Sequence, residues 1–134
     1  MTRRRVAVEV GLAAVAGWCV MAVPYLGDTS ARQGEAAFLP FMAGVVEQMG
    51  SVSILLLLLL GVAFGVVGRV SPWVLGFAAV ATLPAWSAVD MVMGGGQHNL
   101  WPFEWLAYVF YGVVTSLGAF VGRARTRASS GPRG

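Results

Sequence analysis

Lysine is absent from this chain of 134 residues, and cysteine and histidine occur once each. The single cysteine, Cys19, excludes an intrachain disulfide. Together with the single histidine, His98, it is too little for a structural zinc site or a bis-histidine haem site. The glycines at 94–96 have no lysine after them, so they do not form a phosphate-binding loop. We therefore expect no catalytic residue, no metal and no cofactor, and predict that the protein is not an enzyme.

Charge is also scarce. Only 11% of the residues are charged, whereas 57% are hydrophobic and the mean hydropathy is +0.74. Soluble domains are usually about 45–50% apolar, so this composition excludes a soluble globular domain. The net charge of +3 comes from arginines at the ends of apolar runs. Because these arginines are not gathered into one basic face, we expect a lipid bilayer as the partner and no nucleic acid.

Long apolar runs are what the chain does have. Residues 50–68 contain no ionisable side chain, and at about 1.5 Å per residue this run is long enough to cross the hydrocarbon core of a bilayer. Similar runs occupy residues 6–26, 72–93 and 103–121. The sequence predicts an all-α integral membrane protein: a four-helix transmembrane bundle forming one domain over residues 1–122. A disordered basic cytoplasmic tail is expected over residues 123–134.

The arginines predict an orientation. Eight of the nine fall on one side of a four-span topology: Arg3, Arg4, Arg5, Arg69, Arg123, Arg125, Arg127 and Arg133. Only Arg32 falls on the other side. The positive-inside rule then places both termini in the cytoplasm of a multi-pass protein, which we expect in a bacterial inner membrane. Cleavage of the first span as a signal peptide remains an alternative, with a poor cleavage site near Ala31.

Local signals predict where the spans begin and bend. Ser71 is placed to cap the third helix, with Pro72 at its first helical position. Pro84 removes a backbone hydrogen bond and should bend that helix. Apolar residues spaced three and four apart at 36–49 predict an outer interfacial helix.

Small residues recur four apart in every span, which allows helix backbones to approach closely in lipid. The pairs are Ala13 and Gly17, Gly61 and Gly65, Ala81 and Ala85, and Gly118 and Gly122. They predict a closely packed bundle and leave open a homo-oligomer through an unused small face.

Four ionisable residues form a candidate outer polar cluster: Glu47, Asp90, His98 and Glu104. They lie near the predicted outer ends of the second, third and fourth spans. In one interpretation they are solvated interfacial groups. In the other they converge to hold a cation, relay protons or receive a basic group of a partner. We further expect Asn99 to be the helix cap of the last span, where Glu104 would complement the helix dipole.

The stretch His98, Asn99, Trp101, Pro102 and Glu104 has the pattern His-Asn-x-Trp-Pro-x-Glu. Over residues 72–122 the chain resembles uncharacterised small bacterial four-span proteins that carry this pattern before the last span. The resemblance implies four membrane spans and assigns no reaction. Together these observations predict a structural or accessory component of the membrane, with a membrane-protein partner or a homo-oligomer. The alternative is a small oligomeric transporter or channel that uses the outer acidic cluster.

Overall fold

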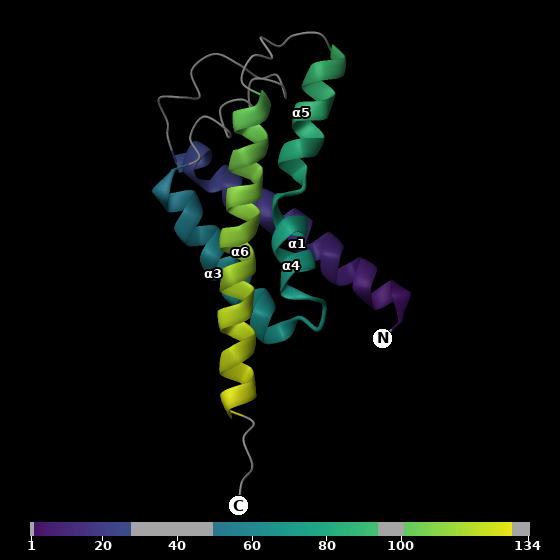
Figure 1. Cartoon of the computed structure of the whole chain (residues 1–134), viewed down its shortest axis with the longest axis vertical. Helices are drawn as coiled ribbons and strands as arrows, with labels where there is room; N and C mark the ends of the chain where they lie inside the picture. Colours follow the sequence, from purple (N-terminus) through teal and green to yellow (C-terminus); the bar gives the residue numbers. More distant parts are fainter. Residues whose placement is uncertain (1, 28–49, 94–100, 130–134) are drawn as a thin grey trace, which may run out of the picture.

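A computed structural model describes residues 2–27, 50–93 and 101–129, and within these ranges the chain is helical and has no strand (Figure 1). The helices are α1 (Arg3–Gly27), α3 (Ser51–Val67), α4 (Pro72–Val80), α5 (Thr82–Met93) and α6 (Trp101–Ser129). Three stretches are long and apolar enough to cross a membrane: Arg3–Pro24, Pro72–Val89 and Trp105–Ala128. The prediction of an all-helical membrane protein is therefore confirmed at this level.

Helix α3 is the shortest of the predicted spans. It has 17 residues, which is the lower limit, about 17, of the helix lengths that cross a bilayer. The part of the chain with assigned structure thus has three candidate spanning stretches and one shorter apolar helix. The four-span bundle stays a prediction.

In Figure 1, α1 rises obliquely, α3 descends, α4 and α5 rise one after the other, and α6 descends. The first residues of α1, the connection between α3 and α4, and the C-terminal part of α6 lie toward the lower end in this view. The end of α5 and the start of α6 lie at the upper end. Helix α6 packs on α3 and α4, and α1 packs on the same two helices. Helices α3 and α6 consequently run parallel to each other.

The contact between α3 and α6 depends on glycine. A Cβ atom added to Gly61 would lie 2.1 Å from the carbonyl oxygen of Thr115, and one added to Gly65 would lie 2.1 Å from that of Ala119. The relationship is reciprocal, because added Cβ atoms on Gly118 and Gly122 would lie 2.2 Å from carbonyl oxygens of α3. Only hydrogen fits at these four positions. The two predicted small-residue pairs therefore pack against each other within one chain.

Helix α4 lies between α1 and α6 and is held by small residues on both sides. Gly17 of α1 packs directly on the backbone carbonyl of Ala79, and Ala13 is completely buried. On the other side, Gly76 packs on Ser116 of α6. The remaining predicted pair, Ala81 and Ala85, is exposed, so it does not take part in the packing seen in the described ranges.

The buried apolar residues form two clusters. One contains Met21, Ala22, Leu57, Val80, Leu83 and Tyr108, and the other contains Ala13, Val70, Leu75 and Ala78. Many large apolar side chains remain outside these clusters. Exposed ones include Val8, Leu12, Val15 and Val23 on α1, Leu55, Leu59, Val66 and Val67 on α3, and Leu106, Val109, Phe110, Leu117 and Phe120 on α6. A surface this apolar is suited to lipid contact and not to water.

The third predicted span is broken between α4 and α5. The N–H of Ala81 donates to the carbonyl of Ala78, 3.2 Å away and three residues earlier, instead of four. Pro84 explains the position of the break. It has no N–H to donate to the carbonyl of Val80, and its ring would crowd that carbonyl. The predicted distortion is present, and it lies one turn before the proline.

Ser71 is the residue before α4, and Pro72 opens the helix, as predicted. The capping interaction itself differs from the expectation, because the Ser71 side chain makes no cap hydrogen bond. Its carbonyl accepts the N–H of Leu75 at 3.1 Å instead. Proline at the first helical position has no N–H group, so the start of this helix has one unpaired N–H group fewer.

Helix α6 continues to Ser129, so residues 123–129 are helical. The sequence-based expectation of a disordered tail from residue 123 is wrong for this stretch. Alanine and arginine are good helix formers, and Arg127 in the last turn suits the negative end of the helix dipole. The side chain of Arg123 is also fixed by contacts with the α3–α4 connection, which are described below. Residues 130–134 and the predicted interfacial helix at 36–49 lie outside the described residues.

Candidate functional site

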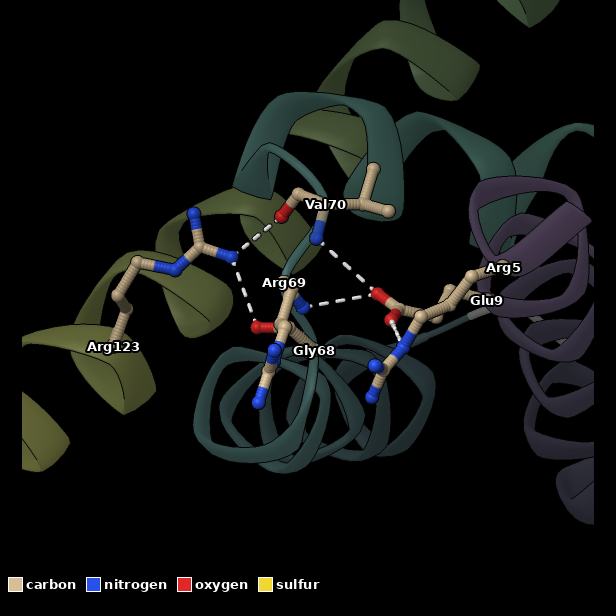
Figure 2. Close-up of polar contacts among 6 residues, drawn as sticks. All are labelled: Arg5, Glu9, Gly68, Arg69, Val70 and Arg123. Atoms are coloured by element: carbon tan, nitrogen blue, oxygen red, sulfur yellow. Dashed lines mark hydrogen bonds and ion pairs between the residues drawn. The ribbon is translucent and has the colours of Figure 1, made fainter. Parts of the chain in front are cut away.

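A set of polar contacts surrounds the connection between α3 and α4 (Figure 2). Here the backbone leaves the helix at Gly68, whose N–H still donates to the carbonyl of Phe64 at 2.7 Å. The following residues enter α4 with N–H and carbonyl groups that no helix bond satisfies. Such groups are costly near the hydrocarbon region of a membrane unless another part of the protein pairs with them.

Glu9 of α1 satisfies the donors. Its Oε2 atom accepts the N–H of Arg69 at 2.9 Å and the N–H of Val70 at 3.2 Å. Its other oxygen, Oε1, lies 3.5 Å from Nε of Arg5, one helical turn earlier. The side chain of Glu9 is only 17% exposed, whereas that of Arg5 is 55% exposed. The Glu9 carboxylate therefore interacts mainly with the backbone of the connection and little with solvent.

Arg123 of α6 satisfies the acceptors. Its Nη2 atom donates to the carbonyl of Gly68 at 3.1 Å and to the carbonyl of Val70 at 2.5 Å. Figure 2 shows the carboxylate and the guanidinium on opposite sides of the connection. We call Glu9, Arg123 and residues 68–70 the connection clamp. It ties α1 and α6 to the same short segment.

From the sequence, Arg123 is expected to begin a basic tail, and Glu9 has no assigned contact in the fold. The signal that could have revealed the clamp is the shortness of the connection, since a turn with few residues leaves backbone groups that need side-chain partners. An acid and an arginine predicted at the same membrane end are suitable partners. The pairing itself spans about sixty residues and has no local pattern.

Two buried hydroxyl groups of α6 bond to their own helix. Thr115 Oγ1 donates to the carbonyl of Tyr111 at 2.8 Å, and Ser116 Oγ donates to that of Gly112 at 2.7 Å. This back-bonding is usual for hydroxyl side chains in membrane helices. Ser53 Oγ and Thr82 Oγ1 are buried and make no hydrogen bond. The hydroxyls of Thr115 and Ser116 are thus used within their own helix.

A groove lies between the first turns of α1 and the last turns of α3. Its volume is about 250 Å³. Val8 and Leu12 form the α1 wall, Phe64 and Val67 form the α3 wall, and Arg5 and Glu9 lie at the polar end. The groove is therefore apolar along most of its length and charged at one end.

The predicted outer polar cluster is only partly covered by the structure. Glu47, His98 and Asn99 lie outside the described residues. Asp90 is in the last turn of α5 and Glu104 is in the first turn of α6, and these two helix ends lie at the same end of the molecule (Figure 1). Convergence of the four side chains, and the capping role of Asn99, remain predictions. Among the described residues, no group of three His, Cys, Asp or Glu side chains could hold a metal ion.

Comparison of the chain with protein-family models, curated proteins and solved structures finds no match. The class of the protein therefore rests on its own fold. The chain is an all-helical membrane protein whose lower end is tied together by the connection clamp. Its resemblance to small bacterial four-span proteins stays a prediction.

Proposed function

We propose that this chain is a four-span protein of a bacterial inner membrane, with both termini in the cytoplasm, and that it acts as a non-enzymatic structural or accessory component. The observation that carries the proposal is the connection clamp. Glu9 and Arg123 contact a segment more than fifty residues away in the sequence, and both bond to backbone. Their chemistry holds helices in place.

The position of α3 supports the fourth span. Its glycines pack on α6 between Thr115 and Ala119, which is the middle of the candidate span Trp105–Ala128. A helix in contact with the middle of a membrane span lies at the same depth. Its residues Leu55 and Leu59 are more than half exposed, which in that position means contact with lipid. Seventeen residues are enough to cross the core if the helix is not strongly tilted.

The arginines support the orientation. The clamp brings Arg5, Arg69 and Arg123 to one end of the molecule, although they come from three different helices or connections. Arg125 and Arg127 follow on the same end of α6. An end so rich in arginine faces the cytoplasm under the positive-inside rule.

The packing favours a structural role over transport. Transport by alternating access needs helices that can rock or slide against each other. Here α3 and α6 interlock through four glycines, and α1 and α4 pack through Gly17. Backbones in such close contact cannot move apart without losing most of their van der Waals contact. This supports a fixed bundle that presents its outer surface to a membrane-protein partner.

Affinity purification in mild detergent tests the proposal. A tagged copy expressed at its native level should carry a membrane protein in a fixed stoichiometry, and deletion of the chain should lower the amount or the complex size of that partner. The transporter alternative makes a different prediction. If the chain purified alone as a homo-oligomer, and vesicles containing it showed a cation or proton flux that E104Q abolished, the accessory role would be rejected.

A further inference from the structure

We propose that the groove between α1 and α3 binds one acyl chain of an anionic phospholipid, with the lipid phosphate held by Arg5 and Arg69. The proposal goes beyond the accessory role, and it does not depend on which side of the membrane the groove faces.

The shape and lining of the groove fit an acyl chain. Val8, Leu12, Phe64 and Val67 form its two walls, and three of these side chains are strongly exposed: Val8 at 53%, Leu12 at 58% and Val67 at 80%. The volume of about 250 Å³ can take part of a flexible hydrocarbon chain, which is the apolar group that surrounds a membrane helix in a bilayer.

The charge at the polar end fits a phosphate. Arg5 contacts Glu9 through Nε alone, so its two terminal amino groups are directed away from that contact (Figure 2). Arg69 is used in the clamp through its backbone N–H, which leaves its guanidinium outside the hydrogen bonds of the clamp. In Figure 2 both guanidinium groups extend to the side opposite Val70. Arg5 lines the polar end of the groove, and Arg69 directly follows Gly68, which also lines it. Two positive charges beside the end of an apolar groove match the charge of a lipid with one phosphate.

Glu9 does not cancel this charge. Its carboxylate is already engaged by the N–H groups of Arg69 and Val70 and by Nε of Arg5. It interacts electrostatically with both Arg5 and Arg69, and it lines the groove itself. With two positive charges and one negative charge, the polar end remains positive.

Native mass spectrometry of the full chain in mild detergent tests the site, because it resolves the first bound lipid. The probes are phosphatidylglycerol, which is anionic, and phosphatidylcholine of the same acyl composition, which is zwitterionic. We expect tighter binding of phosphatidylglycerol.

R69Q should weaken the binding of phosphatidylglycerol about fivefold and leave the binding of phosphatidylcholine unchanged. One arginine near an anionic lipid contributes about 1 kcal/mol, which corresponds to that change in affinity. R5Q should act in the same direction. The matched control is R125Q, which removes the same charge from the exposed end of α6 and should change binding less than twofold.

A second pair of variants tests the groove. L12F fills the apolar part and should weaken the binding of both lipids, whereas L117F changes a lipid-facing residue of α6, 51% exposed, and should have no effect. Three results would overturn the proposal: equal affinity for the two lipids, an effect of R125Q as large as that of R69Q, or an effect of L12F no larger than that of L117F. Displacement of phosphatidylglycerol by a second copy of the chain would also overturn it, since the groove would then be an interface.

Discussion

Glu9 and Arg123 do not bond to each other, yet both bond to Val70. The N–H of Val70 donates to the Glu9 carboxylate, and its carbonyl accepts from the Arg123 guanidinium. The two ionised side chains thus satisfy one peptide segment from two sides, and the segment lies between them (Figure 2). Because the charges act on backbone dipoles, the geometry of the connection depends on both residues. Predictions about the clamp follow from this arrangement.

The first prediction concerns Glu9. E9A leaves the N–H groups of Arg69 and Val70 without an acceptor, and a lost partner of this kind costs about 1–3 kcal/mol. E9Q keeps a carbonyl oxygen in the same place and should cost less. Unfolding of the purified protein by increasing sodium dodecyl sulphate in mixed micelles measures both. R5A serves as the control, since the 3.5 Å contact of the exposed Arg5 contributes at most about 1 kcal/mol. Equal losses for E9A and R5A would contradict the clamp.

The second prediction concerns Arg123. R123A removes two charge-assisted hydrogen bonds to carbonyls, and we expect a loss of about 1.5–3 kcal/mol in the same unfolding assay. R123K should recover only part of it, because the lysine side chain is one bond shorter than the path to Nη2 of arginine, so its ammonium group reaches the two carbonyls less well. R125A changes an exposed arginine two residues later and should stay within about 0.5 kcal/mol of the native protein.

The double variant separates the clamp from two independent contacts. Since Glu9 and Arg123 share Val70, the loss for E9A/R123A should be smaller than the sum of the single losses by about 0.5 kcal/mol or more. Once one of the two side chains is removed, the connection is less ordered, so the hydrogen bonds of the other side chain stabilise the fold less. Strict additivity would mean that the two residues act separately.

The sequence predicted the helices well because their signals are local. The apolar runs identify the stretches now seen as α1, α4 with α5, and α6, and Ser71 and Pro72 mark the beginning of α4. The small-residue pairs also predicted close packing. Gly61 and Gly65 could not indicate their partner, however, because a small residue is suited to any helix. That α3 packs in parallel on Gly118 and Gly122 is a property of the folded bundle.

The remaining features depend on tertiary contacts. The acid at Glu9 has two backbone partners about sixty residues away, and no periodicity indicates such a pairing. The helical stretch 123–129 was missed for a related reason, since its first residue, Arg123, is fixed by another part of the chain. The structure does not describe the side chains of the predicted outer polar cluster, Glu47, Asp90, His98 and Glu104. Their convergence stays a prediction, and E104Q tests whether the cluster serves transport.

The third prediction tests the glycine contacts. G65A would place a Cβ atom 2.1 Å from the carbonyl oxygen of Ala119, and a backbone atom cannot move aside as a flexible side chain can. We expect a loss of about 1–3 kcal/mol from the forced separation of α3 and α6. G11A is the matched control, since a Cβ at Gly11 meets nothing within 4 Å. That change should be neutral or should stabilise α1 by up to about 1 kcal/mol, because alanine is the better helix former. A harmless G65A would show that the two helices are not in close contact.

The fourth prediction concerns orientation. If the arginine-rich end that contains the clamp faces the cytoplasm, alkaline phosphatase fused after Gly134 should be inactive, because the enzyme needs an oxidising compartment to form its disulfides. The same enzyme inserted between Gly94 and Gly96 should be active. A fluorescent protein that folds in the cytoplasm should give the opposite result at both positions and controls for poor expression.

An active phosphatase at Gly134 and an inactive one at 94–96 would reverse the topology, and the clamp would then lie at the outer face. Phosphatase activity at both positions would mean that the chain crosses the membrane an even number of times between them, which would exclude α6 as a single span and with it the four-span bundle.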